Sequence, residues 1–140
     1  MNIYADSSFI VSLYLPDEHT PKVERLMREN PRLFLTPLHR AEWAHAIAFQ
    51  IFQRRISAAE SDGLYKLFEK DRRAGAWLEA AVPETAFDLA VDLARQHASE
   101  IACRTLDTLH VATALELHSD DFWTFDQRQA KLAKAVGLES

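Results

Sequence analysis

The sequence contains few of the residues that cross-link or interrupt a chain. Its 140 residues include one cysteine, three glycines and five prolines. Cys103 alone cannot form a disulfide within the chain, which is typical of proteins from a reducing compartment, so we expect a cytoplasmic protein. Because so few glycines and prolines leave little linker, and because this length suffices for one core, we expect a single domain over residues 1–140.

Long apolar runs and an excess of positive charge are also lacking. No apolar run approaches the roughly 20 residues of a membrane-spanning helix, and the N-terminus lacks the basic and apolar regions of a signal peptide. The 21 Asp and Glu residues outnumber the 16 Lys and Arg residues, and the net charge is −5. We therefore expect no membrane partner and no broad basic surface that wraps nucleic acid. An enzyme whose acids are neutralised by metal ions stays compatible with this balance.

Short apolar runs alternate with helical patterns along the chain. The runs are typical of buried strands, and capping residues or prolines mark the starts of several helices. This alternation predicts an α/β fold in which helices cover both faces of a parallel sheet. We expect strands at residues 2–6, 33–35, 78–81 and 122–125, an edge strand from Leu138, and helices at 7–15, 20–29, 38–55, 58–72, 83–98, from the cap residue Thr105, and at 127–135.

Two acids end predicted strands. Asp6 ends the first strand, Asp126 ends the last long apolar run, and each is followed by a predicted helix. Aspartate before a helix is a preferred N-cap worth about 1 kcal/mol, and capping suffices to explain either residue alone. The carboxyl ends of parallel strands, however, form the edge of a sheet where ligands bind. We expect Asp6 and Asp126 to occupy equivalent positions at that edge.

Two further acids fall early in helices that begin on the same side of the sheet. Glu42 borders the apolar face of the helix predicted over residues 38–55. Asp107 lies in the first turn of the helix after Thr105, where the helix dipole favours negative charge. For the helix with Glu42, we expect one face to bury Leu38, Ala41, Ala44, Ala48, Phe49 and Phe52, and the opposite side to carry His39, Gln50 and Gln53.

The predicted site therefore gathers four carboxylates, those of Asp6, Glu42, Asp107 and Asp126. Four acids cannot stay ionised together without a counter-charge, and hard divalent cations with oxygen ligands supply one. Such a cation lowers the pKa of a bound water, and a second can stabilise a leaving oxygen, as phosphoryl chemistry requires. We interpret the four acids as both catalytic and metal-binding.

The ordered set of motifs resembles the PIN-domain ribonucleases, and more narrowly the VapC-like toxins of type II toxin–antitoxin pairs. Each matching stretch is short, and it is their order over nearly the whole chain that makes the resemblance specific. It implies a three-layer α/β/α fold with a mostly parallel five-stranded sheet. The stretches are Tyr4–Ser8 with Leu13–Pro16, Arg40–Trp43, Arg104–His110, and Thr124–Gln129 continuing through Leu132 and Ala133 to Leu138.

The resemblance implies Mg²⁺ or Mn²⁺ at Asp6 and Asp107, with the other two acids completing the site. Ser7 and Thr124 match small hydroxyl positions that hydrogen-bond the acids or their waters. The implied reaction is endonucleolytic cleavage of RNA by a metal-activated water. The implied partners are the RNA substrate, a second copy in a homodimer, and a small antitoxin protein that blocks the acidic site.

Basic residues near the motifs are candidates for holding RNA phosphates. They are Arg40, Arg104, Arg128 and Lys131, and solvated surface charge is the simpler explanation for any one of them. The histidines lack a zinc-binding spacing, and we expect His110 to pack or cap rather than to bind metal.

Two other functions compete with a nuclease. A receiver-like phosphoacceptor domain would need an acid pair beside the first strand and a lysine after a late strand, whereas the chain has Asp6-Ser7-Ser8 and Asp126 there. A non-catalytic PIN-type module would bind only RNA or a protein partner, and the four intact acids count against it.

Overall fold

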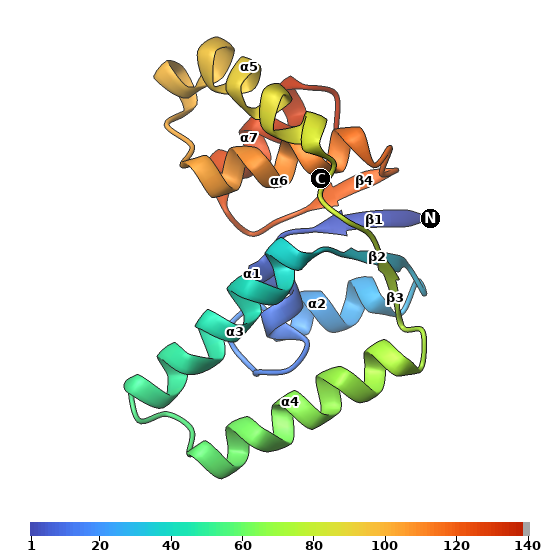
Figure 1. Cartoon of the computed structure of the whole chain (residues 1–140), viewed down its shortest axis with the longest axis vertical. Helices are drawn as coiled ribbons and strands as arrows, with labels where there is room; N and C mark the ends of the chain where they lie inside the picture. The colour runs from blue at the N-terminus through green and yellow to red at the C-terminus, as the bar shows by residue number, and fades with distance from the viewer. Residues whose placement is uncertain (139–140) are drawn as a thin grey trace.

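The computed structural model describes residues 1–138, which form a parallel sheet with helices on both faces (Figure 1). The strand order is β3-β2-β1-β4, and every neighbouring pair is parallel. The predicted α/β/α fold is confirmed, with four strands in place of five among the described residues; the edge strand predicted from Leu138 would run into residues 139 and 140, outside them. The strands are β1 (Asn2–Ala5), β2 (Arg32–Leu35), β3 (Trp77–Glu79) and β4 (Asp121–Trp123).

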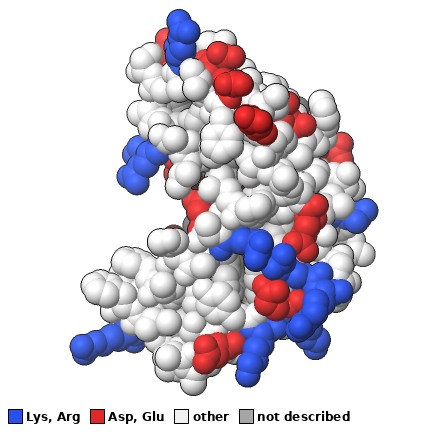
Figure 2. Space-filling model, in the orientation of Figure 1, with Lys and Arg blue, Asp and Glu red and all other residues white. Residues whose placement is uncertain are grey.

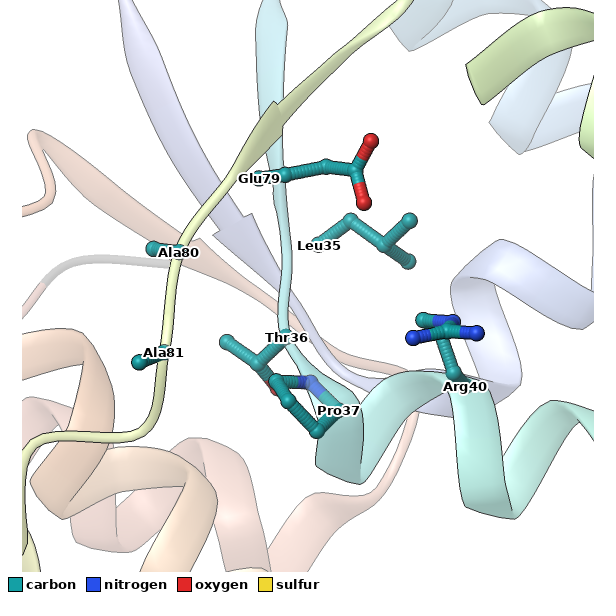
Figure 3. A pocket seen from close by; sticks show the side chains of 7 residues that line it. All are labelled: Leu35, Thr36, Pro37, Arg40, Glu79, Ala80 and Ala81. Atoms are coloured by element: carbon teal, nitrogen blue, oxygen red, sulfur yellow. The ribbon is translucent and has the colours of Figure 1, made fainter. Parts of the chain in front are cut away.

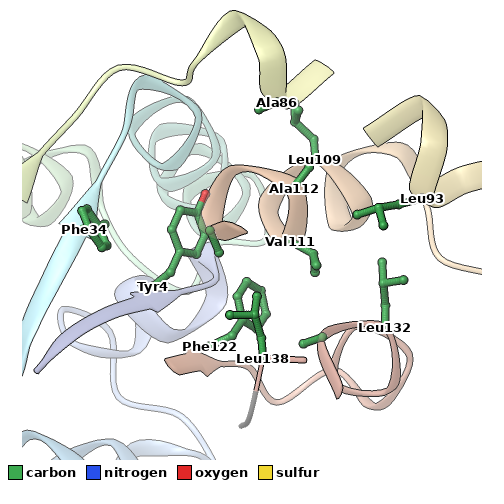
Figure 4. Packing of buried hydrophobic residues seen from close by; sticks show 12 residues of the cluster. Tyr4, Phe34, Ala86, Leu93, Leu109, Val111, Ala112, Phe122, Leu132 and Leu138 are labelled. Atoms are coloured by element: carbon green, nitrogen blue, oxygen red, sulfur yellow. The ribbon is translucent and has the colours of Figure 1, made fainter. Parts of the chain in front are cut away.

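One face of the sheet is covered by the C-terminal helices, which lie above the sheet in Figure 1. Because successive strand residues point to opposite faces, Tyr4, Phe34 and Phe122 all point to this side, where they join the core drawn in Figure 4. The rings of Tyr4 and Phe122 stack with centroids 5.6 Å apart. The helices are α5 (Glu84–Ile101), α6 (Thr105–Glu116) and α7 (Gln127–Ala135).

The opposite face is covered by the N-terminal helices. The alternate strand residues Ile3, Leu33 and Leu35 point to this side and are almost completely buried. Two adjoining clusters form the core here, one around Phe9 and one around Trp43. The helices are α1 (Ser7–Ser12), α2 (Thr20–Met27), α3 (Pro37–Phe52) and α4 (Ala58–Arg73).

Helix α3 buries a different face from the predicted one. Its buried residues, His39, Trp43 and Ile47, are spaced four apart, as one helix face requires. The prediction was wrong for Phe49 and Phe52, whose side chains are 53% and 81% exposed, and for Ala41 and Ala48, which are also exposed. It was wrong as well for His39, which was expected on the opposite side and is buried. Apolar content alone did not identify the buried face, because α3 carries apolar residues on both sides.

The interior position of His39 depends on hydrogen bonds to both ring nitrogens. Its Nδ1 accepts the Thr36 backbone N–H at 3.0 Å, and its Nε2 donates to the Ala5 carbonyl at 2.8 Å. Burial lowers the pKa of His39 to about 3. A neutral histidine is therefore a satisfied core residue that joins α3 to the end of β1.

The observed helix starts agree with the predicted ones more closely than the observed strand ends do. Asp6, Ser57 and Asp126 cap α1, α4 and α7 through their side chains, as their types predict. The cap of α6 is Arg104 rather than Thr105. Strand β4 ends at Trp123, three residues before Asp126, whereas Asp6 follows β1 directly, so the two acids are not equivalent in position.

Within residues 1–138 no helix is both long and apolar enough to cross a membrane.

Candidate active site

The carboxyl ends of the strands face a hollow between the two halves of the molecule. Helices α1 and α3 each begin within two residues of the end of β1 or β2, and α7 begins shortly after β4. In the space-filling view the outline is indented on this side, and acidic side chains lie at the indentation (Figure 2). This edge is where we predicted the four acids to meet.

Asp6 is held on both carboxylate oxygens. Its Oδ1 accepts the Phe9 backbone N–H at 3.1 Å and the Ser8 hydroxyl at 2.6 Å. Its Oδ2 lies 2.9 Å from the Thr124 hydroxyl. Only 7% of Asp6 is exposed. The N-cap role and a place in the site are therefore compatible, because capping occupies one oxygen and leaves the other facing β4.

Glu42 reaches from α3 to the start of α1 and to α6. Its Oε1 accepts the Ser7 hydroxyl at 2.7 Å and is hydrogen-bonded to Nε2 of His110. Burial of the Glu42 carboxyl would raise its pKa, but the hydrogen bonds from His110 and Ser7 lower it, and the pKa of Glu42 lies below its ordinary value. The carboxylate is thus fixed as an anion.

Behind His110 stands Tyr4. The Tyr4 hydroxyl lies 2.7 Å from Nδ1 of His110, and burial raises the pKa of Tyr4, so the hydroxyl keeps its proton and donates it. His110 therefore carries a proton on Nε2 that points at Glu42. The prediction that His110 packs or caps missed this contact, because the sequence does not reveal that α3 and α6 meet across the end of β1.

Asp107 and Asp126 are held by backbone N–H groups rather than by side chains. Asp107 Oδ2 accepts the Arg104 N–H at 3.3 Å, and Asp126 Oδ1 accepts the N–H groups of Arg128 and Gln129 at 2.9 and 3.0 Å. Burial raises the pKa of Asp107 against the effect of the Arg104 bond, and the negative charges of Asp126 and Asp6 raise it further. Three of the four acids are therefore electrostatically coupled.

The carboxylate oxygens of these four acids are the kind of ligand that hard cations bind. Within residues 1–138, Oε2 of Glu42, Oδ1 of Asp107 and Oδ2 of Asp126 accept no hydrogen bond. No three His, Cys, Asp or Glu side chains of these residues are close enough together to hold an ion as they stand. Mg²⁺, however, binds through one or two carboxylates and keeps several waters, so Asp6 and Asp107 fit it without a third protein ligand.

The predicted basic residues lie on the surface, and two of them, Arg104 and Arg128, adjoin the acids. Arg40, Arg104 and Arg128 are all exposed. Arg40, from α3, lines a hollow of about 310 Å³ beside the ends of β2 and β3, which Glu79 of β3 also lines (Figure 3). Arg104 and Arg128 contact the site acids through their backbone N–H groups. Their guanidinium groups remain candidates for phosphate binding.

Residues that the sequence analysis did not select connect the acids to one another. Tyr4 and His110 support Glu42, and Ser8 supports Asp6. Gln129 links Thr124 to the Asp107 backbone. The sequence offered one signal for Gln129 and His110, namely a polar residue among the apolar residues of a helix. In the structure these two side chains are 0% and 2% exposed.

The fold has close counterparts among solved structures. VapC20 of Mycobacterium tuberculosis, described as a toxin that cleaves the sarcin-ricin loop, superposes with a TM-score of 0.69 at 16% identity, over 97% of this chain and 95% of that one. A chain of FitAcB from Neisseria gonorrhoeae gives 0.68 at 18% identity, over 94% and 93%. No curated protein sequence matches. At these identities the likeness concerns the fold alone.

The sequence also matches a family model, that of the PIN domain, over residues 3–135. The matched region includes all four acids and the side chains that hold them. This match excludes the receiver-like alternative. The chain belongs to the PIN domain family.

Proposed function

We propose that this protein is a metal-dependent endoribonuclease and the toxin of a toxin–antitoxin pair. The observation that supports this most is the arrangement of Asp6, Asp107 and Asp126. Their charges are close enough to raise the pKa of Asp107, so the site favours a cation when all three are ionised. The PIN family and the VapC-type fold are consistent with the same chemistry.

In this proposal Asp6 and Asp107 bind Mg²⁺ or Mn²⁺, and Glu42 and Asp126 complete the site. A cation held there would supply a water of lowered pKa and would stabilise negative charge on the phosphate. Glu42 could accept a proton on Oε2, because Ser7 and His110 hold its other oxygen. Asp126, at the start of α7, presents the oxygen that accepts no hydrogen bond, and Ser7 and Thr124 orient the acids.

RNA would enter over the rim of the hollow between the two halves of the molecule, at the carboxyl ends of the strands. Arg104 and Arg128 are exposed beside Asp107 and Asp126, and Arg40 is exposed by the ends of β2 and β3, so each could pair with a phosphate that approaches the edge of the sheet. Their positions offset the acidity of the site without making the whole surface basic. This explains how a chain with a net charge of −5 could hold a polyanion.

Protein partners are proposed from the exposed apolar residues as well as from the family. Phe49 and Phe52 of α3 and Phe87 and Val91 of α5 are more than half exposed. Apolar side chains gathered on a surface favour a protein contact. We propose that they serve a homodimer mate and an antitoxin that covers the acidic site, in a cytoplasmic protein.

The direct test is cleavage of a mixed RNA substrate by the purified protein with Mn²⁺, beside Asp107→Asn and the exposed control Asp88→Asn. The proposal predicts cleavage by the wild type and by the control, none by Asp107→Asn, and none by any of them in EDTA. Equal cleavage by Asp107→Asn would contradict the site. RNA binding without cleavage by any form would favour the non-catalytic PIN-type module.

A further inference from the structure

Gln129 is a fully buried amide between two parts of the acidic site. It lies in the first part of α7 and is 0% exposed. Its Nε2 donates to the backbone carbonyl of Asp107 at 3.2 Å, and its Oε1 lies 2.7 Å from the Thr124 hydroxyl. A carbonyl oxygen can only accept, so the amide nitrogen must face Asp107 and the amide oxygen must face Thr124. The orientation of the amide is thereby settled.

The Thr124 hydroxyl has more acceptors than protons. It accepts the Asp126 N–H at 3.0 Å, and it lies 2.9 Å from Asp6 Oδ2 and 2.7 Å from Gln129 Oε1. A hydroxyl carries one proton, so it can donate to Asp6 or to Gln129 but not to both at once. The charged carboxylate is the stronger acceptor, and with the proton there the buried oxygen of Gln129 has no donor among the described residues.

We propose that Gln129 is a positioning residue that couples cation binding at Asp6 to the Thr124 hydroxyl. This inference rests on the proposed function. A cation beside Asp6 weakens its carboxylate as a hydrogen-bond acceptor, and the hydroxyl then turns to Gln129. The buried amide oxygen gains its donor at that moment, which favours the cation-bound state. Gln129 therefore raises the affinity for the cation without touching it.

The second bond of the amide adds a geometric role. By holding the Asp107 carbonyl, Gln129 fixes the first turn of α6 against the end of β4. Asp6 and Asp107, the two proposed ligands, are thus connected through Thr124 and one buried side chain. Outer partners of this kind commonly change metal affinity by about 10–100-fold.

The test is Mn²⁺ binding by the metal-free full chain, measured by calorimetry well below the melting temperature of each variant. Gln129→Met keeps the volume and removes both bonds, and we expect it to weaken Mn²⁺ binding about tenfold. Thr124→Val should weaken binding as well, and the double variant should be no weaker than Gln129→Met alone, because Thr124 and Gln129 act through one proton and Gln129→Met already removes the bond to the Asp107 carbonyl. Thr124→Ser should bind like the wild type.

The outcomes separate this inference from the proposed function. If the wild type does not bind Mn²⁺, both are overturned. If the wild type binds and Gln129→Met binds equally well, or if the two substitutions add independently, only the role of Gln129 is overturned. A glutamine that served stability alone would lower the melting temperature and leave the dissociation constant unchanged.

A second measurement needs no variant and so does not depend on one folding. Addition of Mg²⁺ to the wild type should shift the NMR signal of the Gln129 side-chain carbonyl carbon, because its oxygen gains a hydrogen bond. The signal of Gln96, which is exposed on α5, serves as the control and should not move. A Gln129 signal that stays unchanged at saturating Mg²⁺ would overturn the inference.

Discussion

Two walls of the same site hold their acids in different ways. On the wall formed by α1 and α3, Asp6 and Glu42 accept hydrogen bonds from the side chains of other residues. On the wall formed by α6 and α7, Asp107 and Asp126 accept bonds from backbone N–H groups at the starts of their own helices. The first wall depends on tertiary contacts in addition to the cap that Asp6 forms on α1, whereas the hydrogen bonds to the two carboxylates of the second wall are local to their own helices.

The electrostatic consequences are opposite. The pKa of Glu42 lies below its ordinary value because His110 and Ser7 outweigh burial. The pKa of Asp107 lies above its ordinary value because burial and the charges of Asp126 and Asp6 outweigh the Arg104 bond. In the proposed site, a cation would therefore relieve repulsion around Asp107, whereas Glu42 already has a hydrogen-bonded partner in His110.

The largest expected effect comes from removing the charge of Asp107, a proposed cation ligand on the wall formed by α6 and α7. Asp107→Asn keeps the shape and the bond to the Arg104 N–H, and we expect it to lower RNA cleavage by at least about 100-fold, since a proposed ligand is worth several kcal/mol of transition-state stabilisation. Initial rates at saturating Mn²⁺ measure this. Retention of wild-type rates would show that the two walls do not differ as described.

The next effect breaks the tertiary contact on the other wall. His110→Leu removes the proton that faces Glu42, and we expect about 10–100-fold slower cleavage, as for other partners of site acids. His110→Gln keeps a donor and should recover part of the loss. Both rates should be compared on protein shown to be folded by circular dichroism. Full activity of His110→Leu would mean that Ser7 alone fixes Glu42.

Acidic pH should weaken the fold through His39, which lies on the same wall as Glu42. The pKa of His39 is lowered to about 3 by burial, so between that value and the ordinary pKa of 6.5 the unfolded chain binds a proton that the fold excludes. The free energy of unfolding should then fall as pH falls below about 6.5, by up to about 1.4 kcal/mol per pH unit from this group.

Urea denaturation across pH 5–7.5 checks this sign. His39→Gln should flatten the dependence, while the exposed His45→Gln on the same helix should leave it unchanged. Identical slopes in the wild type and His39→Gln would refute the neutral, buried state of His39.

The smallest effect is a pair of opposite changes in melting temperature without metal. At pH 7 the lowered pKa of Glu42 means that its charge stabilises the fold, so Glu42→Gln should lower the melting temperature. The raised pKa of Asp107 means that its charge destabilises the fold, so Asp107→Asn should raise it. Both shifts correspond to less than about 1 kcal/mol, because both carboxylates are partly solvated. Scanning calorimetry in EDTA measures them, and shifts of equal sign would remove the contrast.

Much of the fold was predictable because it depends on local patterns. The alternation of apolar strands with capped helices predicted the parallel sheet and its two helical layers, and cap residues such as Ser57 and Asp126 predicted helix starts. Phe49 and Phe52 were misassigned because burial on α3 is decided by what packs against it. The polar His39 is buried there because β1 supplies a carbonyl that no local pattern reveals.

The sequence allowed us to predict where the four acids of the candidate site lie along strands and helices. It did not allow us to predict the side chains that hold them. Each acid lies near a strand end or a helix start, which sequence can identify. The partners of Glu42 lie in β1, α1 and α6, and Gln129 is hydrogen-bonded to Thr124, just after β4, and to Asp107 of α6. Contacts between segments so far apart in sequence follow from the packing of the layers, which a single sequence does not specify.

The most direct measurement is an anomalous difference map from crystals grown with Mn²⁺. We predict a peak between the carboxylates of Asp6 and Asp107, with the Glu42 carboxylate still bonded to His110. The same crystals of Asp107→Asn should lack the peak. A peak elsewhere on the protein, or none at the carboxyl edge of the sheet at saturating Mn²⁺, would show that Asp6 and Asp107 do not bind the cation.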